Sequence, residues 1–299
     1  MTFGNLGGRA ENAVLCFGSA ALLLALAGWS GGAGAVPMQT EGAFSVQPDG
    51  TADYSVPIAV PPGTAGMAPS ISLNYSSANG DGVLGSGWSL GGLASINRCP
   101  ETIAQDGQSI GVSITGTDVN GNATDRYCYG GQRLIAIGYY NGGTEYRTEI
   151  DGISRIVSQG TEGNGPQYFL VYTKSGQIQE FGNTPDSNIQ AIGANGPIGT
   201  ARAWALDKVS DRVGNYYTVT YSTEDTTTGE SHPVEIDYTG NSSNGNSLAP
   251  YNSVKFLYNQ TRTYPLIAHL AGTTATTTAL LTNVQSFAGA SLVHDYQLQ

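Results

Sequence analysis

The sequence predicts an all-β protein of mostly antiparallel strands joined by glycine-rich turns, either sandwich-like or a continuous meander shell. Three observations lead to this fold class. Apolar and polar residues alternate with period two along most of the chain. Glycine accounts for 42 of the 299 residues, and Asn-Gly, Ser-Gly and Gly-Gly steps separate the alternating runs. Charged residues make up only 12%, about half of the usual globular share, which excludes long charged helices.

The first element is a predicted secretion signal peptide, residues 1–35, with a helical apolar run. That run extends from Ala13 to Trp29 and follows one early positive charge, Arg9. Ala33-Gly34-Ala35 supplies the small residues that a signal peptidase accepts, so cleavage is expected before Val36. A membrane anchor is the alternative, but about 17 apolar residues are marginal for a span. We therefore expect a secreted protein, exported through the periplasm or cell envelope, with no stable membrane span after cleavage.

Residues 36–299 are expected to form one β-rich module, since no composition break divides them. The expected strands cover residues 54–60, 71–75, 94–97, 109–115, 126–129, 132–138, 145–150, 153–158, 167–173, 177–182, 203–209, 216–222, 233–238, 253–258, 264–270, 280–287 and 291–298. Pro57 indicates an edge position, and Asn120-Gly121 and Ser175-Gly176 indicate tight hairpins. Residues 183–200, 223–232 and 239–252 are expected to be loops. No amphipathic helix is expected after the signal.

The chain is acidic, with 23 Asp+Glu against 12 Lys+Arg and a net charge of −11. This charge repels phosphate, so no nucleic-acid partner is expected. Val, Ile, Leu and Tyr are plentiful and regularly spaced, which argues against disorder. The acidity is therefore expected to serve solubility.

Two cysteines remain after the signal, Cys99 and Cys128. Export through an oxidising compartment favours a disulfide between them, which closes a loop of about 30 residues and contributes about 3.6 kcal/mol in the chain-entropy treatment. Two buried thiols are the alternative. Without clustered histidines the pair does not supply the tetrahedral ligand set of zinc, and no cofactor is expected. Arg126 and Arg133 flank Cys128 and are expected to form ion pairs with acids such as Asp125.

One motif suggests catalysis. Gly87-Trp88-Ser89-Leu90-Gly91 matches the G-x-S-x-G nucleophile elbow, which needs a strand before the serine and a helix after it. Here a glycine-rich turn precedes Ser89, and no helix start follows it. A triad also needs a histidine beside an acid, from His232, His269 or His294. The favoured interpretation is structural, with Trp88 anchored in the core.

Residues 118–123 resemble the first half of a calcium loop. Ala123 and Tyr129 stand where an EF-hand needs glycine and glutamate, so a hairpin tip is the favoured interpretation. The alternative is a calcium site of another kind, made of Asp118, Asn120, Asn122 and Asp125.

Three acidic residues, Glu145, Glu149 and Asp151, lie close together and suggest a glycosidase pair. Glu145, Arg147 and Glu149 share one face of an expected strand, however. An exposed charge ladder is therefore the favoured interpretation.

A series of motifs runs in order through residues 42–298. It includes Gly50-Thr51-Ala52-Asp53-Tyr54-Ser55-Val56-Pro57-Ile58, Gly85-Ser86-Gly87-Trp88-Ser89-Leu90 and Trp204-Ala205-Leu206-Asp207-Lys208-Val209-Ser210-Asp211-Arg212-Val213-Gly214-Asn215. The series resembles the SpvB-type domain, the N-terminal module of the Salmonella virulence plasmid B protein. That domain also opens the B components of insecticidal toxin complexes and some RHS/YD-repeat proteins. The motif residues singled out are Trp88, Arg98, Arg126, Arg133, Trp204, Asp211, Gly214 and Asn215.

The resemblance implies a structural and interaction module of a secreted bacterial toxin or RHS-type assembly, without enzymatic activity. Its implied partners are other domains or subunits of that assembly, which forms a shell around a toxic segment. Residues 204–222 are similar to a single YD-like repeat, and the last expected strand ends without a turn. The chain is therefore expected to be the N-terminal piece of a longer protein. The paired Glu-x-Glu motif of the virulence protein's transferase domain does not occur here.

Two other function classes stay open. A secreted adhesin or carbohydrate-binding β-module would use the flat rings among the 17 tyrosines and 3 tryptophans. A hydrolase at Ser89 is the third class.

Overall fold

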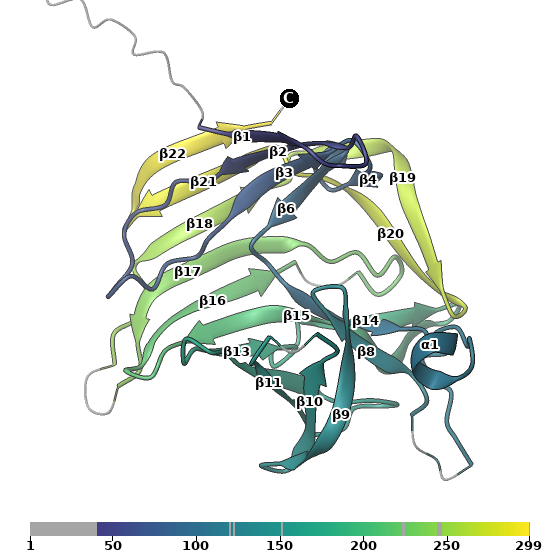
Figure 1. The fold of residues 1–299 in the computed structure, drawn as a ribbon. Helices are drawn as coiled ribbons and strands as arrows, with labels where there is room; N and C mark the ends of the chain where they lie inside the picture. Colours follow the sequence, from purple (N-terminus) through teal and green to yellow (C-terminus); the bar gives the residue numbers. More distant parts are fainter. Residues whose placement is uncertain are drawn as a thin grey trace, which may run out of the picture. The chain divides into compact units, whose positions relative to one another are not determined.

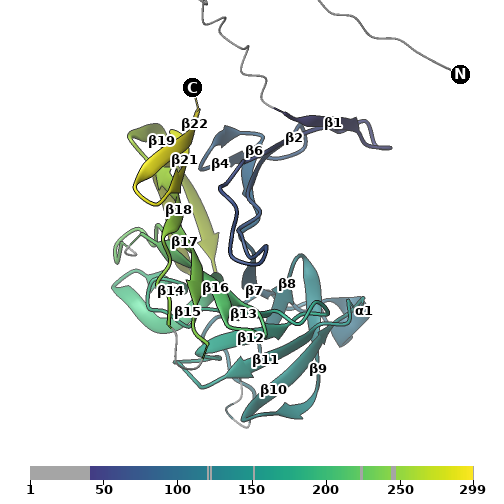
Figure 2. The ribbon, with the colours of Figure 1, turned by 90° about the vertical axis from the view of Figure 1, so that its left-hand side faces the viewer.

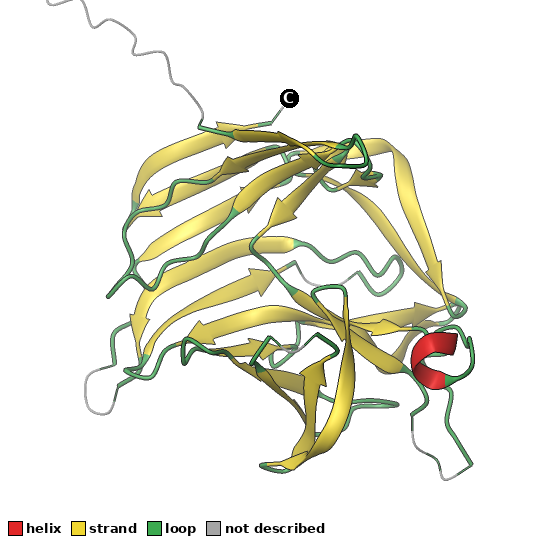
Figure 3. Ribbon diagram, in the orientation of Figure 1, coloured by secondary structure: helices red, strands yellow, loops and turns green. Residues whose placement is uncertain are grey.

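A computed structural model describes residues 41–298, apart from 120, 122, 151, 223–224 and 244–246. Figure 3 shows that strands dominate this part of the chain, and the strand pairings are antiparallel, so the all-β prediction is confirmed. One turn of helix, α1 (Ile103–Asp106), was not expected. The predicted secretion signal, residues 1–35, lies outside the described residues.

Eight strands close into a ring because β13 pairs with β15 at the end of the path β13-β12-β11-β10-β9-β8-β7-β15. Two-residue turns join β8 to β9 and β9 to β10, and residues 173–177 join β12 to β13. At Ser175-Gly176, Gly176 adopts a φ of 85°, which glycine allows without steric cost. The ring strands are β7 (Ser95–Cys99), β8 (Arg126–Tyr129), β9 (Gln132–Tyr140), β10 (Gly143–Thr148), β11 (Arg155–Gln159), β12 (Tyr168–Tyr172), β13 (Ile178–Phe181) and β15 (Gly196–Ser210).

Strand β15 also belongs to a second, open sheet (Figure 1). Its C-terminal half pairs with β16 as well as β13, and its N-terminal half pairs with β14 as well as β7. The fifteen-residue strand is therefore the junction of the two assemblies. The open sheet adds β16 (Asn215–Tyr221), β17 (Pro233–Asn241), β18 (Asn252–Leu257), β21 (Asn283–Ala288) and β22 (Ser291–Gln297) on one side, and β14 (Asn188–Gly193), β20 (Thr273–Leu280) and β19 (Gln260–Leu270) on the other.

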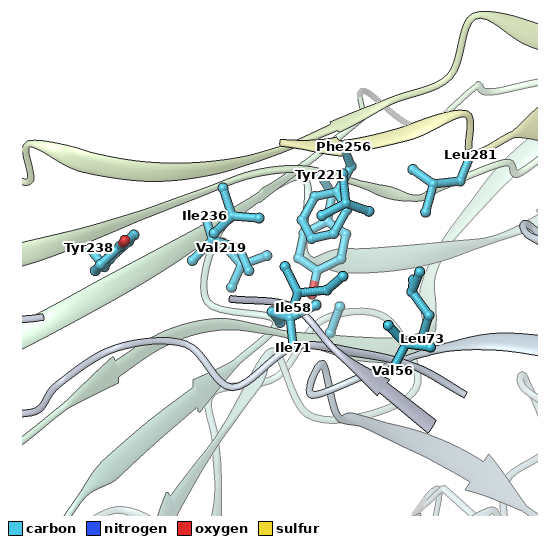
Figure 4. Close-up of a cluster of buried hydrophobic side chains, with 13 residues drawn as sticks. Val56, Ile58, Ile71, Leu73, Val219, Tyr221, Ile236, Tyr238, Phe256 and Leu281 are labelled. Carbon is cyan, nitrogen blue, oxygen red and sulfur yellow. The ribbon is translucent and has the colours of Figure 1, made fainter. Parts of the chain in front are cut away.

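A small sheet packs against the open sheet, so this half is sandwich-like (Figure 2). It contains β1 (Ala43–Val46), β2 (Ala52–Pro57), β3 (Ser72–Ser76) and β6 (Trp88–Gly91), with the short pair β4 (Asp81–Gly82) and β5 (Gly85–Ser86) beside it. Figure 4 shows apolar side chains of both layers meeting, for example Ile58 and Leu73 with Ile236 and Phe256. Period-two alternation provides this shared apolar face.

A second core fills the ring. Trp204, Phe169, Phe181 and Ile96 are completely buried there, and the rings of Phe169 and Trp204 meet edge to face at 5.0 Å. The Trp204 Nε1–H donates to the carbonyl of Pro166 at 3.1 Å, which satisfies the one polar group of its indole. The ring is thus a packed core rather than a channel.

Three expectations about strands are wrong. Residues 109–115 form no strand. Residues 183–200, expected as a loop, contain β14 and the start of β15. Pro57 was expected on an edge strand, but it lies in β2, which is an inner strand. It is the last residue of β2 and lies beyond the residues that pair with β1, so its missing N–H removes no hydrogen bond to β1.

Candidate functional site

A cavity of about 650 Å³ lies where β9 diverges from β8. Its walls come from three places: the segment 100–125, which we call the strap, the strands β8 to β11, and residues 160–166. The strap joins β7 to β8 and carries α1. Most of the charged motif residues predicted from the sequence gather around this cavity.

Arg98 and Asp125 form a buried ion pair beside the cavity. The Arg98 Nη1 donates to the Asp125 Oδ2 at 2.9 Å, and the two side chains are 0% and 2% exposed. Arg98 also donates to the carbonyls of Ala201 and Asn164, at 2.7 and 2.9 Å. Its guanidinium lies 5.5 Å from the Trp204 ring. One side chain therefore connects β7, the strap, residues 160–166 and β15.

Asp125 also organises the strap. Its carboxylate accepts the backbone N–H groups of Ser113 and Ile114, each at 2.7 Å. Ile114 has a φ of 62°, a conformation that a β-branched residue rarely adopts, and its carbonyl accepts the Asn164 amide at 2.9 Å. These bonds, together with the complete burial of Ile114, hold the left-handed turn in place and explain why no strand forms over residues 109–115.

Arg126 and Arg133 bind Asp106, not Asp125 as expected. The Arg133 Nη2 lies 2.7 Å from the Asp106 Oδ1, and the Arg126 Nε lies 3.0 Å from the same oxygen. The Thr102 backbone N–H first, and then the two guanidinium groups, hold the pKa of Asp106 at about 2, against the opposing effect of partial burial. The physical reason for the different partner is α1, whose single turn places Asp106 between the two arginines while Arg98 occupies Asp125.

Cys99 and Cys128 are joined by a disulfide between β7 and β8, with the two Cα atoms 5.9 Å apart. The bond closes the strap at its base. We expect an intact mass two hydrogens lower than that of the reduced chain and no alkylation without reductant. Replacing both cysteines by serine is expected to lower the free energy of unfolding by about 3–4 kcal/mol, measured by urea denaturation. Two alkylatable thiols in the native protein would contradict this prediction.

Ser89 lies on β6, and strand β7 rather than a helix follows it. Its hydroxyl donates to the Asn74 carbonyl of the neighbouring strand at 3.3 Å. Gly87 has a φ of 77°, and a Cβ there would lie 2.5 Å from the Tyr75 ring. Glycine therefore allows the backbone at this position to pack closely against Tyr75. The local structure of a nucleophile elbow is therefore not present at Ser89.

Of the predicted acidic grouping, Glu145 and Glu149 have structural partners, and Asp151 lies outside the described residues. Glu145 binds Arg147 at 2.9 Å and Arg155 at 3.2 Å, which agrees with a charge ladder across strands. Glu149 accepts a hydrogen bond from Gln105 of α1. Two residues of the alternative calcium site, Asn120 and Asn122, lie outside the described residues, while Asp125 is already bound to Arg98.

The two tryptophan motif residues differ in exposure. Trp204 is completely buried, so it offers no surface to a glycan. Trp88 is partly buried against the sandwich core, with its ring 5.4 Å from that of Tyr75. The most exposed tyrosine rings are those of Tyr264 and Tyr139, at 83% and 76%.

The YD-like unit forms the turn between β15 and β16. The Asp211 Oδ1 accepts the N–H groups of Val213 and Asn215, at 2.9 and 3.0 Å, and Gly214 has a φ of 87°. A Cβ at Gly214 would lie 2.8 Å from the Ser243 nitrogen. Asp211, Gly214 and Asn215 therefore stabilise one turn.

Asp207 is a buried acid that the sequence did not reveal. It lies on β15 at the junction of the two sheets and is 3% exposed. Burial raises its pKa to about 7, the Asn183 backbone N–H, which donates at 3.4 Å, offsets part of the rise, and the charge of Glu180 adds to it. In the sequence, Asp207 directly follows the apolar residues Trp204-Ala205-Leu206. That position indicates burial only once the strands that pair with β15 are known.

Together, the fold and these bonds define a β-rich structural module whose charged motif residues mostly hold the architecture. The chain belongs to the SpvB family: the family model described as Salmonella virulence plasmid 65kDa B protein matches residues 46–263. The predicted resemblance is thereby confirmed. A search of curated proteins finds no match.

Solved structures share this fold. A crystal structure of TcdB2-TccC3 has a TM-score of 0.65 at 18% identity, covering 86% of this chain and 15% of that one. The Photorhabdus luminescens Tc holotoxin pore has a TM-score of 0.63 at 18% identity, covering 84% and 14%. The N-terminal domain of the effector SpvB from Salmonella typhimurium has a TM-score of 0.60 at 15% identity, covering 82% and 93%. The match thus spans about a seventh of the toxin-complex chains and nearly all of the SpvB domain.

No helix in the described part of the chain has both the length and the apolar character needed to cross a bilayer.

Proposed function

We propose that this chain is a structural and interaction module of a secreted bacterial toxin or RHS-type assembly, and that it has no catalytic role of its own. The observation that carries the proposal is family membership over residues 46–263, together with a fold shared with chains of Tc toxin complexes. In this proposal its partners are other domains or subunits of the assembly, and the place of action is extracellular. The signal peptide over residues 1–35 and a longer parent polypeptide remain part of the same proposal.

The bonding of the charged motif residues supports a structural role. Arg98, Arg126 and Arg133 each bind at least one acid, and Ser89 binds a neighbouring carbonyl. Such interactions fix the strap, the ring and β15 relative to one another. A shell component requires a rigid structure, and these interactions provide it without a reactive side chain.

The proposal is tested by native electrophoresis of culture medium from bacteria that carry an epitope tag inside the gene, in the exposed loop around Thr226. We expect the tag to migrate with a large assembly or a long polypeptide. A free chain no larger than the 31.0 kDa sequence mass, combined with saturable hydrolysis or transfer, would overturn it. A fluorophosphonate probe that labels Ser89 would favour the hydrolase class instead.

Carbohydrate binding is the second candidate, and the exposed rings of Tyr264 and Tyr139 favour it. Selective binding on a glycan array that is lost in Tyr264→Ala or Tyr139→Ala would support this class. Trp204→Ala is unsuitable as a test because the buried indole holds the ring core.

A further inference from the structure

The hairpin of β9 and β10 leaves one edge of β9 without a strand partner. Strand β8 pairs only with the first two residues of β9, Gln132 and Arg133. Strand β10 pairs with Leu134 to Tyr140 on the opposite side, and Figure 1 shows this hairpin projecting at the bottom of the view. Within the described ranges no strand lies along the remaining edge of Leu134–Tyr140. Backbone N–H and C=O groups on that edge are therefore open to pairing.

This edge lacks the charges and prolines that protect other edge strands from pairing, and its one irregularity is the register shift at Ile137. Residues Leu134–Tyr140 contain no charge and no proline, and Ile137 and Tyr139 are 55% and 76% exposed. In contrast, β19 carries Pro265, β22 carries Asp295, and β1 has only four residues. Charges, proline and short length are the usual means of preventing edge-to-edge contact. The part of this edge before the register shift, Leu134–Ala136, is uncharged and apolar and fits a short strand partner.

The cavity lies directly beside the open edge. A register shift at Ile137 divides the edge, and the first part, Leu134–Ala136, lines the cavity. Tyr127, Tyr146 and residues 163–166 also line the cavity. A volume of about 650 Å³ suits one short extended segment, because ligand pockets of roughly 300–1,000 Å³ enclose molecules of that size. It has no room for a second copy of the hairpin with its neighbouring strands.

The charges around the cavity decide the chemistry of the occupant. Asp125 is bound to Arg98, and both Arg126 and Arg133 are bound to Asp106. A charged side chain entering the cavity would therefore find its counter-charges already engaged and would lose its hydration. Uncharged side chains avoid this cost.

We propose that the open edge of β9 binds an extended, uncharged polypeptide segment, which adds as a strand along Leu134–Ala136 and places alternate side chains in the cavity. Backbone hydrogen bonds supply the affinity, and the cavity supplies the selection for small apolar or hydroxyl side chains. This binding surface goes beyond the proposed function and does not depend on it.

The test uses the full chain and a fluorescent hexapeptide of alternating threonine and valine. We expect saturable binding that slows hydrogen exchange of the amides of Leu134–Ala136. Ile135→Lys, at a position that is 40% exposed, is expected to weaken binding at least tenfold, while the same change at the exposed Ile267 of β19, outside the edge, leaves it unchanged. The same peptide with N-methyl groups on one edge cannot pair and is expected not to bind.

Three results would overturn the proposal: no saturable binding of the hexapeptide, binding that survives N-methylation, or binding that is equal in Ile135→Lys and Ile267→Lys. Concentration-dependent protection of the β9 amides in the free chain would assign the edge to a second copy instead. Circular dichroism of each variant confirms that the strand content is retained, so loss of fold is distinguished from loss of binding.

Discussion

Arg98→Met is expected to lower the free energy of unfolding by about 3–5 kcal/mol, because it leaves the Asp125 carboxylate buried without its counter-charge. The substitution also removes the donors to the carbonyls of Ala201 and Asn164, which are bound at 2.7 and 2.9 Å. A loss of this size is a large part of the roughly 5–15 kcal/mol that stabilises a typical domain. Urea denaturation followed by tryptophan fluorescence measures it, since Trp204 lies beside Arg98.

Arg126→Met is the matched control, because Arg126 is also an arginine that binds acids of the strap. Its side chain is 39% exposed, and after the change Arg133 still binds Asp106 while Gln108 still donates to Glu101, the second acid that Arg126 binds. A loss below about 1 kcal/mol is expected there. The double variant Arg98→Met with Asp125→Asn is expected to lose less than the sum of the single changes, by more than about 1 kcal/mol. Equal losses in Arg98→Met and Arg126→Met would show that the buried pair does not hold the strap.

Asp207→Asn is expected to stabilise the protein at pH 8 and to have little effect at pH 4. The folded-state pKa of Asp207 is about 7, above its ordinary value of 3.8. Between these values the folded chain keeps a proton that the unfolded chain releases, so stability is highest below pH 4 and falls as the pH rises toward 7. One unit of pKa corresponds to about 1.4 kcal/mol, so the gain at pH 8 is at most about 4 kcal/mol.

Urea midpoints of the wild-type protein and Asp207→Asn at several pH values between 4 and 8 measure this effect. Asp225→Asn is the control, because hydrogen bonds from the Thr227 side chain and backbone lower the pKa of that exposed carboxyl. Removing its charge is expected to give no gain in stability at pH 8. A difference between wild type and Asp207→Asn that stays constant with pH would contradict the assigned ionisation.

The sequence was sufficient to predict those strands and turns that depend on residues close together in the chain. Period-two alternation and Gly-containing turns predicted the hairpins of the ring, including the turn at Ser175-Gly176. They failed for residues 109–115, where the Asp125 carboxylate binds the N–H groups of Ser113 and Ile114 and prevents a strand. They also failed for β14, because its residues resemble a loop and become a strand only by pairing with β15 and β20.

The sequence predicted which residue types form the candidate site, but it did not predict which acid each arginine binds. The sequence indicated that Arg126 and Arg133 form ion pairs with acids, but the acid named as an example, Asp125, is bound by Arg98 instead. The choice of Asp106 depends on the single turn of α1 and on Arg98, which lies 27 residues before Asp125 in the chain and beside it in space. Partners at such separations are set by how strands are ordered in a sheet, which no local pattern encodes.

The sequence by itself determined the all-β class, the antiparallel hairpins, the candidate cysteine pair and the family motifs, because each depends on neighbouring residues or on their order. The tertiary structure alone decided that β13 pairs with β15 to close a ring, that Asp207 is buried at the junction, and that one edge of β9 stays open. The physical reason is that closure, burial and edge exposure depend on which distant strands become neighbours. Alternation within a strand specifies its two faces but not its partners.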